Sequence, residues 1–188
     1  MDKHRHFMIH KPWGMISQFN NPHKRKKRLL GELFDFPEKT MAIGRLDVNS
    51  EGLLLLTTDG KVSEYIRSKK VEKEYYVQVD GEISQDALNL LKKGVEIGFD
   101  GKKYKTKHCK ASLINNPNFK DRSQKIRDER HGPTSWISIT ITEGKFRQVR
   151  KMTAAVGFPT LRLIRIRIGT LLLDGLDLEE VKEVENLL

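Results

Sequence analysis

An arginine and an aspartate stand one residue apart on a polar stretch that leads directly into an apolar run. Arg45 and Asp47 fall within residues 44–52, and residues 53–58 read Leu-Leu-Leu-Leu-Thr-Thr. A carboxylate placed at the edge of a buried strand can act as a nucleophile or as a general base. The pair can equally be a structural salt bridge in a turn, and without other information the salt bridge is the simpler interpretation.

The other residues that could bind a metal or a cofactor form no recognised pattern. His4, His6 and His10 lie near the start of the chain, where solvated histidines are commoner than metal ligands. Cys109 is the only cysteine, so neither a disulfide framework nor a thiolate cluster is possible. No glycine-rich phosphate loop occurs. Gly144 and Lys145 open an expected helix whose start could hold one phosphate, which is a weak signal by itself.

The charge of the chain favours an anionic partner, of which nucleic acid is the commonest. The formal net charge is +10, and the sequence pI is about 9.7. The basic residues cluster, whereas residues 174–185 are strongly acidic, so we expect a positive face and a negative back. Ordinary charged loops are the alternative. The clusters are Lys24–Arg28, then Lys102, Lys103, Lys105, Lys107 and Lys110, then Lys120, Arg122, Lys125, Arg127 and Arg130, and finally the basic residues between Lys145 and Arg167.

The elements that must position Arg45 and Asp47 are strands. Residues 7–9 predict a short strand, residues 41–47 a strand that runs into a polar loop, and residues 53–58 a buried strand. Residues 61–67 look helical, and residues 75–79 are rich in β-forming side chains. A short helix is expected within residues 29–34.

The second half of the chain continues the alternation of strands and short helices. Ser84 predicts the N-cap of a helix that ends at Gly94, and residues 94–114 predict short strands with turns at Gly98 and at residues 100–101. Residues 115–134 predict a long loop. The further expected elements are a half-buried strand over residues 136–142, a helix over residues 144–156 with Phe146, Val149, Met152 and Val156 on its apolar side, strands over 161–168 and 171–173, and a short helix in the acidic tail.

These elements predict an α+β fold with a mixed, mostly antiparallel sheet and a few short helices. We expect a single domain over residues 1–188, because no linker rich in Pro, Gly or Ser interrupts it. No signal peptide and no apolar run of about 20 residues is present, so the expected location is the cytoplasm and no membrane contact is expected. The absence of a coiled-coil pattern favours a monomer.

Five stretches resemble, in the expected order, the motifs of the RsuA family of RNA pseudouridine synthases. Among them, residues 44–60 match the signature without a gap, and together the stretches span residues 6–173. Within the family the likeness is to a branch that acts on large-subunit ribosomal RNA and lacks a separate N-terminal RNA-binding (S4) domain. The basic loop at 24–28 and the acidic tail depart from the family pattern. The other motif stretches are residues 11–14, 73–75, 143–152 and 163–169, and the branch likeness comes from residues 126–130, 133–136 and 157–163.

The resemblance implies a pseudouridine synthase fold with a central RNA-binding cleft and a reaction that needs no cofactor. Asp47 matches the catalytic carboxylate, and Arg150 matches the guanidinium that keeps it ionised. Tyr75 matches a residue that stacks on the flipped uracil, and Leu163 matches an apolar residue of the uracil pocket. Without the resemblance, Tyr75 and Leu163 are ordinary strand core.

The resemblance and the charge pattern together predict RNA contacts on several loops. We favour Arg127 and Arg130, because the loop 115–134 has little other reason for its charge, whereas Arg147 and Lys151, on the polar face of the expected helix, could equally be solvated. The expected substrate-binding residues are Lys11, Arg45, Arg127, Arg130, Lys145, Arg147, Leu163 and Arg165.

The expected partner is large-subunit ribosomal RNA, either free or in an assembly intermediate. Three alternatives stand beside it: a non-catalytic RNA-binding or ribosome-assembly module, a basic DNA-binding protein, and a synthase that acts on transfer RNA. The combination of Asp47, Tyr75 and Arg150 disfavours the first, because binding alone does not need these three residues. No helix-turn-helix, zinc finger or basic zipper pattern supports the second.

Overall fold

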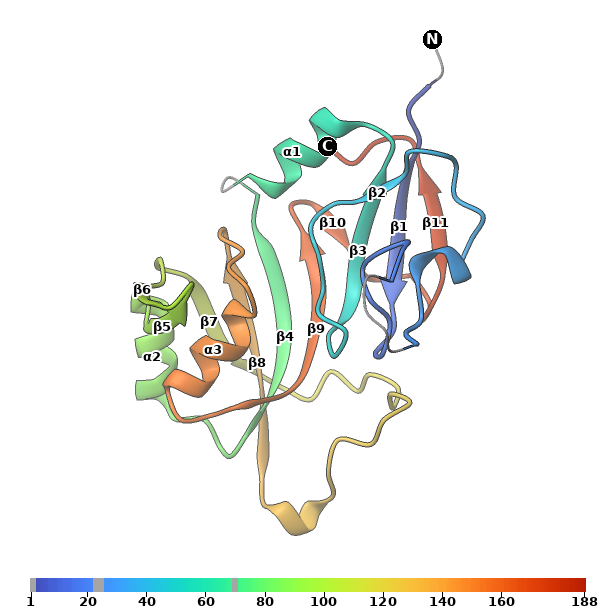
Figure 1. Ribbon diagram of the computed structural model, residues 1–188. Helices are drawn as coiled ribbons and strands as arrows, with labels where there is room; N and C mark the ends of the chain where they lie inside the picture. The colour runs from blue at the N-terminus through green and yellow to red at the C-terminus, as the bar shows by residue number, and fades with distance from the viewer. Residues whose placement is uncertain (1–2, 22–25, 69–70) are drawn as a thin grey trace. The chain divides into compact units, whose positions relative to one another are not determined.

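The computed structural model describes residues 3–21, 26–68 and 71–188, and it divides the chain into two compact units. Unit 1 combines Met1–Val71 with Ile164–Leu188, and unit 2 is the continuous segment Glu72–Leu163. Figure 1 shows the strands and the short helices of both units. Lys24 and Arg25 of the basic run lie outside the described residues. The expectation of a single domain stays a prediction, because compact units are not by themselves separate domains.

Unit 1 is built around β3 (Glu51–Thr57), whose residues are all buried. β1 (His6–Lys11) pairs antiparallel with β3, with Ile9 opposite Leu54, and its other edge pairs with β11 (Val181–Val184). Four consecutive leucines can all be buried only when both faces of a strand are covered, which explains the continuous apolar run that predicted this strand. The smaller elements of unit 1 are β2 (Met41–Ala42), β10 (Leu171–Leu172), the 3-10 helix η1 (Leu30–Glu32) and α1 (Gly60–Arg67).

The start of β3 needs a glycine. β3 runs parallel to β9 (Thr160–Ile168), with Gly52 opposite Arg165. Gly52 has φ +107°, and a Cβ atom at this position would lie 2.3 Å from the Arg165 carbonyl oxygen. Only glycine allows both the backbone angle and the close approach of the two strands.

Unit 2 contains a three-stranded antiparallel sheet in the order β4, β8, β7. β4 (Lys73–Asp80) pairs with β8 (Thr134–Ile141), and β8 also pairs with β7 (Lys110–Ile114). The alternating isoleucines of β8 are buried together with Val77 and Val79 of β4, as expected from the period of two. α2 (Gln85–Lys93), α3 (Gln148–Ala155) and the hairpin of β5 (Glu96–Phe99) and β6 (Lys102–Lys105) contribute to the same unit.

Most of the predicted elements are confirmed. Ser84 caps α2 through its side chain, which accepts a hydrogen bond of 3.2 Å from the Ala87 amide. Residues 115–134 form the expected long loop, apart from the one-turn 3-10 helix η2 (Glu129–His131). Within the two units, the pairing of β3 with β9 is parallel and the other strand pairs are antiparallel. The α+β class with a mixed, mostly antiparallel sheet is therefore confirmed.

Three local predictions are wrong. The helix expected over residues 144–156 begins at Gln148, because Arg147 adopts a left-handed backbone with φ +52°. The acidic tail forms strand β11 rather than a helix, because its backbone pairs with β1. Gly98 lies inside β5, and the turn of the hairpin falls at residues 100–101 alone.

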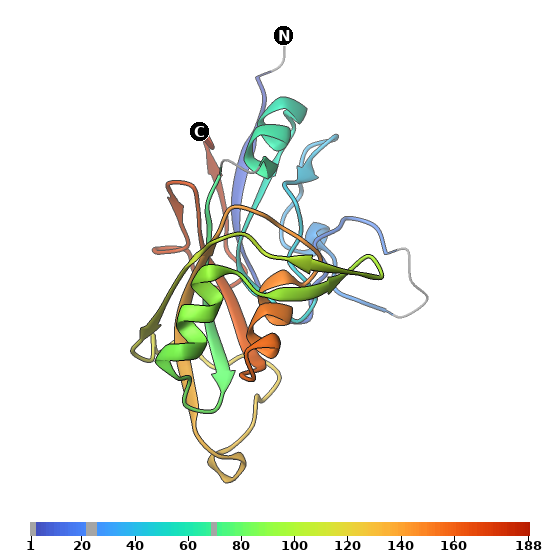
Figure 2. The same ribbon diagram turned by 90° about the vertical axis from the view of Figure 1, so that its left-hand side faces the viewer.

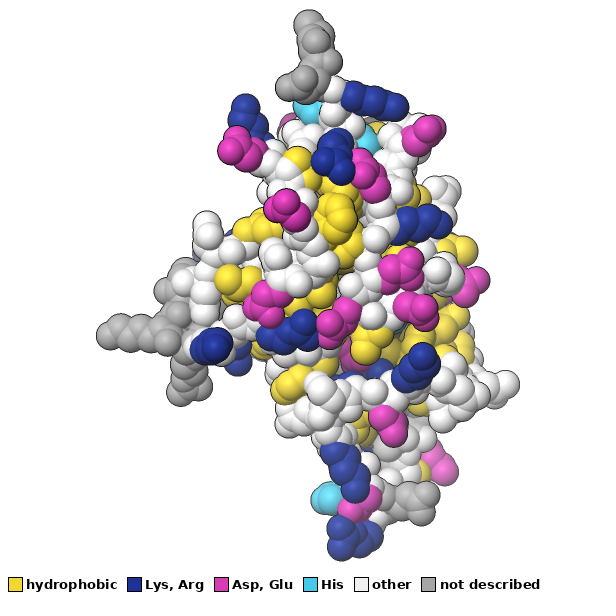
Figure 3. All heavy atoms as spheres, turned by 90° about the vertical axis from the view of Figure 1, so that its right-hand side faces the viewer, with side chains coloured by type: hydrophobic (Ala, Val, Ile, Leu, Met, Phe, Trp, Pro, Cys, Tyr) yellow, Lys and Arg dark blue, Asp and Glu magenta, His cyan; other side chains and the backbone are white. Residues whose placement is uncertain are grey.

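Two carboxylates of the acidic tail form ion pairs with arginines of the same unit. Glu183 forms an ion pair with Arg5 at 2.7 Å, and Glu179 forms one with Arg28 at 2.6 Å. Figure 3 shows one face of the molecule on which basic and acidic side chains are interspersed. The separation of charge that we expected from the sequence is therefore incomplete around the tail.

Candidate functional site

The loop that carries Asp47 is tied to its surroundings at several points. The Ser17 hydroxyl accepts a hydrogen bond of 2.9 Å from the Leu46 amide and donates one of 2.8 Å to the Leu46 carbonyl. Farther along, the Gly14 amide donates to the Val48 carbonyl at 2.7 Å, and the Ser50 amide donates to the Asp47 carbonyl at 2.9 Å. These bonds fix the backbone on both sides of Asp47, which is what a catalytic side chain requires.

The side chains of this loop alternate between the interior and the surface. Leu46 is buried, with 6% of its surface exposed, whereas Arg45 is exposed and Asp47 is half-buried. The Arg45 and Leu46 side chains therefore lie on opposite sides of this stretch. Arg45 is therefore free to meet a large anionic ligand, whereas Asp47 is partly removed from water.

Asp47 belongs to a cluster of charged residues at the entry to β3. Lys11, Glu51 and Arg165 are each at least 96% buried. Burial lowers the pKa of Lys11 to about 7, although the Glu51 and Asp47 carboxylates oppose this lowering. The Arg165 guanidinium reinforces it by charge repulsion. Unit 1 therefore brings together three of the predicted site residues: Lys11, Asp47 and Arg165.

The two buried cations of this cluster are bound to the backbone. The Lys11 ammonium donates hydrogen bonds to the carbonyls of Pro12 and Met15, at 2.8 and 2.6 Å. Arg165 donates from Nε to the Leu53 carbonyl at 2.7 Å, while its buried Nη2 makes no hydrogen bond within the described residues. This geometry does not support the expected contact of Lys11 with RNA phosphate, because the ammonium is fully buried. It supports a role for Lys11 in holding the turn that follows β1.

Unit 2 holds Tyr75, Arg150 and Leu163. Tyr75 lies on β4 opposite Ile139 of β8, and its partly buried side chain packs against the core of the unit. Leu163 belongs to that core and is 4% exposed. Arg150 lies half-buried on α3. Two of these predicted site residues, Tyr75 and Leu163, therefore share one apolar core.

The segment between β8 and α3 is held by a buried carboxylate that our sequence analysis did not single out. Glu143 is 4% exposed. It accepts hydrogen bonds from the Tyr104 hydroxyl at 2.5 Å, the Lys107 amide at 2.8 Å and the Gln148 side chain at 2.6 Å. The bond to Glu143 raises the pKa of Tyr104. The sequence offered two signals for this residue: its place at the start of the motif stretch 143–152, and an acidic side chain just after an apolar strand, directly before Gly144.

The three side chains that follow Gly144 in this segment differ in their exposure and their contacts. Lys145 lies with its ammonium 4.6 Å from the ring centre of Phe99 and 5.0 Å from that of Tyr104, which are cation–π distances. Arg147 is half-buried, and Phe146 is 66% exposed. The prediction that Phe146 lies on the buried side of a helix is wrong, because the helix begins only at Gln148. The helix start expected at Gly144 and Lys145 is wrong for the same reason, so no helix N-terminus is available there to hold a phosphate.

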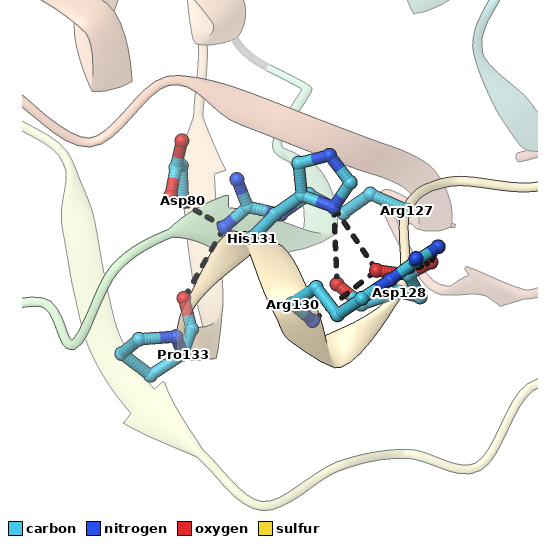
Figure 4. Close-up of polar contacts among 6 residues, drawn as sticks. All are labelled: Asp80, Arg127, Asp128, Arg130, His131 and Pro133. Atoms are coloured by element: carbon cyan, nitrogen blue, oxygen red, sulfur yellow. Dashed lines mark hydrogen bonds and ion pairs between the residues drawn. The ribbon is translucent and has the colours of Figure 1, made fainter.

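Two arginines of the long loop 115–134 form hydrogen bonds and ion pairs within the protein (Figure 4). Arg127 donates from Nη2 to Asp80 at 2.5 Å and to the Pro133 carbonyl at 3.3 Å. Arg130 binds Asp128 through both Nε and Nη2, at 3.1 and 2.5 Å. Its side chain is nevertheless 87% exposed, against 16% for Arg127. The loop therefore has an internal use for these arginines, contrary to the argument by which we assigned them to RNA.

A pocket of about 860 Å³ is lined mostly by residues of this loop, and all of its lining residues belong to unit 2. Phe119 forms part of its wall and contacts Tyr76 and Trp136 with the rings tilted to one another, at ring-centre distances of 6.3 and 6.2 Å. Arg162 also lines the pocket and donates to the Lys120 carbonyl at 2.9 Å. The pocket contains none of the residues that the family resemblance assigns to catalysis.

Residues 3–21, 26–68 and 71–188 give no support for a metal site, a reactive thiol or a membrane-spanning helix. No three His, Cys, Asp or Glu side chains in these ranges lie close enough to hold a metal ion. Cys109 donates to the Leu91 carbonyl at 3.1 Å, and burial raises the pKa of its thiol to about 11. In the same ranges no helix has the length and apolar character to cross a membrane.

Comparison with known proteins identifies the class to which this fold and these motifs belong. The family model for RNA pseudouridylate synthases matches residues 5–155. The chain belongs to this family and is an RNA pseudouridine synthase. It is 41% identical over 172 residues to ribosomal large subunit pseudouridine synthase E of Xanthomonas axonopodis pv. citri, covering 90% of this chain and 88% of the relative.

Further relatives agree with this assignment. The enzyme of the same name from Vibrio parahaemolyticus is 41% identical over 182 residues, which cover 95% of this chain and 73% of the relative. A solved structure described as a pseudouridylate synthase superposes with a TM-score of 0.78 and 28% identity over 98% of this chain and 71% of that one. The family and the fold that the motifs predicted are therefore confirmed.

Proposed function

We propose that this enzyme converts one uridine of large-subunit ribosomal RNA to pseudouridine, with Asp47 as its catalytic carboxylate. The relatives that carry the large-subunit name match nearly the whole chain, which supports this substrate class. The position of Asp47 in residues 44–60 supports its role, because this stretch resembles the signature motif of the family.

The observation that carries the proposal is the setting of Asp47 in unit 1. Its loop is held by the hydrogen bonds of Ser17 and Gly14, and its carboxylate interacts electrostatically with the buried ammonium of Lys11. A carboxylate that is half-buried and fixed can act on a bound nucleotide without first reorganising its own loop. A simple surface salt bridge would need neither this tethering nor a buried cationic neighbour.

The reaction itself places modest demands on the protein. The glycosidic bond between C1′ and N1 breaks, the uracil turns, and a bond forms between C1′ and C5. The proton on C5 leaves, and N1 gains one, so the product is an isomer of the substrate and no oxidant or cofactor takes part. The protein must supply a carboxylate at the sugar or the base, a route for the C5 proton, and contacts that keep the detached uracil in place.

The other predicted residues are assigned to the same uridine. We propose that Tyr75 stacks on the uracil and assists removal of the C5 proton, that Arg150 supplies positive charge to the reaction, and that Leu163 limits the apolar side of the base. The target must leave its helical stack to react, at a cost of a few kcal/mol. Phosphate contacts offset this cost, and we propose Arg45, Arg130, Lys145 and Arg147 for them.

We propose a positioning role, and no direct RNA contact, for Lys11, Arg127 and Arg165. The ammonium of Lys11 is bound by two carbonyls, and Arg127 is bound to Asp80. Arg165 is 4% exposed. We therefore assign these three residues to positioning the segments that carry Asp47 and the long loop, in place of the direct RNA contacts that the sequence suggested.

Mapping of pseudouridines in ribosomal RNA tests the proposal. RNA from cells with and without the gene is labelled with a carbodiimide, and labelled sites are read as stops of reverse transcription. We expect one stop in large-subunit RNA to vanish without the gene and to return with the wild-type gene. Asp47→Ala and Asp47→Asn should not restore it, whereas Asp174→Ala, which changes an exposed carboxylate of unit 1, should.

Two outcomes would contradict parts of this proposal. Activity of purified Asp47→Asn within about tenfold of wild type would remove Asp47 from catalysis, because loss of an essential group costs far more. A lost stop in transfer RNA instead of ribosomal RNA would move the substrate to another class while leaving the reaction intact.

A further inference from the structure

We propose that Phe146 is a stacking platform for an unpaired base of the RNA, distinct from the uridine that is modified. The inference rests on the proposed function, because it takes RNA to be the bound molecule. It concerns a residue that the sequence placed in the interior and that the structure places at the surface, with 66% of its side chain exposed.

The exposure of Phe146 follows from the backbone conformation and the hydrogen bonds of its segment. Arg147 is in the left-handed backbone conformation, at φ +52°, and this turn delays the start of α3 until Gln148. The Lys145 amide donates to the Gln148 side chain at 3.0 Å, and the Gln148 amide donates to the Lys145 carbonyl at 3.1 Å. These two bonds close a tight loop with Phe146 at its outer side. A single exposed apolar ring is common on protein surfaces, so the case for a ligand here rests on the fixed loop that presents the ring and on the charges around it.

The base of this loop is rigid. Glu143 is buried and accepts the three hydrogen bonds from Tyr104, Lys107 and Gln148, so it ties the loop to the chain that follows β6 and to the start of α3. A side chain on a fixed loop loses little conformational entropy when it binds, and an aromatic ring has few rotatable bonds to immobilise. Phe146 is therefore preorganised for a flat partner.

The surroundings of Phe146 are strongly cationic. Residues 94–110 and 143–151 together contain nine Lys or Arg and three Asp or Glu. The Lys151 ammonium lies 5.4 Å from the Phe146 ring centre and donates to the Gly98 carbonyl of β5 at 2.7 Å. The hairpin of β5 and β6, which lies beside α3 in Figure 2, carries exposed Lys102, Lys103 and Lys105.

An exposed aromatic ring among lysines fits one ligand chemistry in particular. Single-stranded nucleic acid offers both a flat base to stack on the ring and a phosphate backbone to attract the cations, and such stacking tolerates any base. A paired base within a duplex offers its edge in the grooves but no free face. The occupant that we infer is therefore a nucleotide in a loop or a bulge of the RNA substrate.

The test compares binding of an RNA transcript that carries the substrate region by wild type, Phe146→Ala, Phe146→Leu and Phe146→Trp. Tyr65→Ala is the control, because Tyr65 is an aromatic residue of unit 1 with 51% exposure. We expect Phe146→Ala and Phe146→Leu to weaken binding by about 5- to 150-fold, the effect of losing one stacked base. Phe146→Trp should bind as wild type does, and so should Tyr65→Ala.

Salt dependence separates stacking from charge. Loss of a stacked base removes no phosphate contact, so the slope of log Kd against log salt should be the same for Phe146→Ala and wild type. Binding of the transcript by Phe146→Leu with wild-type affinity would overturn the proposal, because a leucine cannot stack. Undiminished binding by Phe146→Ala would overturn it as well, and would make a protein partner the better occupant of this surface.

These measurements also distinguish the inference from the proposed function on which it rests. Binding is measured without turnover, so an active Asp47→Asn enzyme would not alter the result for Phe146. Failure of the wild-type protein to bind any ribosomal RNA transcript would remove both. Weakened binding by Phe146→Ala together with unchanged kcat at saturating RNA would support a role for Phe146 in substrate positioning.

Discussion

The Nε atom of Arg165 donates a hydrogen bond of 2.7 Å to the carbonyl of Leu53, and this bond joins two strands at the point where Gly52 faces Arg165. The arginine is 4% exposed, so its side chain runs through the interior of unit 1 beside the backbone of β3. The arginine that acts electrostatically on Lys11 therefore also helps to fix the start of the central strand.

Replacement of Gly52 by alanine should strongly destabilise the protein. The added methyl group would lie 2.3 Å from the Arg165 carbonyl oxygen, at a backbone angle that disfavours any side chain. We expect the free energy of unfolding to fall by about 2–4 kcal/mol, measured by urea denaturation. Gly98→Ala is the matched control, because nothing lies within 4 Å of its added Cβ and its φ is not positive. Equal stability of the two variants would contradict the close approach.

Lys11 should make the stability of the protein depend on pH above neutrality. Burial lowers the pKa of its ammonium to about 7 in the folded chain, whereas an unfolded lysine titrates near about 10.4. Between these values the unfolded chain holds a proton that the folded chain has lost, so stability rises with pH. Relative to Lys11→Met, wild type should gain up to about 1.4 kcal/mol per pH unit. Unfolding curves at about pH 7, 8 and 9 measure this, and a constant difference between the two proteins would disprove it.

The ion pair of Arg127 with Asp80 should restrain the loop 115–134. Arg127 bridges the end of β4 and the Pro133 carbonyl, so its loss frees the loop from two attachments. We expect Arg127→Ala to be cleaved by chymotrypsin within this loop several-fold faster than wild type. Lys125→Ala serves as the control, since it removes an exposed cation from the same loop. Equal cleavage of the two variants would show that the pair does not restrain the loop.

The single thiol should be poorly reactive in the folded protein. Burial raises the pKa of Cys109 to about 11, so almost none of it is thiolate near neutral pH. We expect alkylation by iodoacetamide at about pH 8 to be at least tenfold slower in the folded protein than in urea, as followed by intact mass. Similar rates in the two states would mean that the thiol is more exposed or more acidic than its surroundings indicate.

The sequence predicted correctly those helices and strands whose formation depends on residues within a few positions of one another. The four leucines of β3 and the serine cap of α2 carry their information within a few residues, and both were predicted correctly. The loop that bears Asp47 was also predicted, since polar residues interrupt two apolar stretches there. What no local pattern could reveal is the tethering of this loop by Ser17, which lies 29 residues before Leu46.

The failures share a dependence on contacts that are distant in sequence. The acidic tail has the composition of a helix, but its backbone pairs with β1, and Val184 faces His6. The start of α3 is displaced by a turn at Arg147 within a segment that Glu143 anchors to Tyr104, 39 residues away. The burial of Lys11 was missed for a related reason, because charged residues are mostly exposed unless partners from elsewhere in the chain surround them.

Unit 1 is made of two segments that flank unit 2 in the sequence, and this arrangement sets an order for its assembly during translation. β1 precedes unit 2 in the chain and leaves the ribosome before it, whereas its partner β11 follows unit 2 and emerges after it. Unit 2 is continuous in sequence, so all of its strands are available while the ribosome still holds β11. Until β11 has emerged, one edge of β1 therefore stays open to wrong pairing, and a chain truncated before Val181 would keep that open edge permanently.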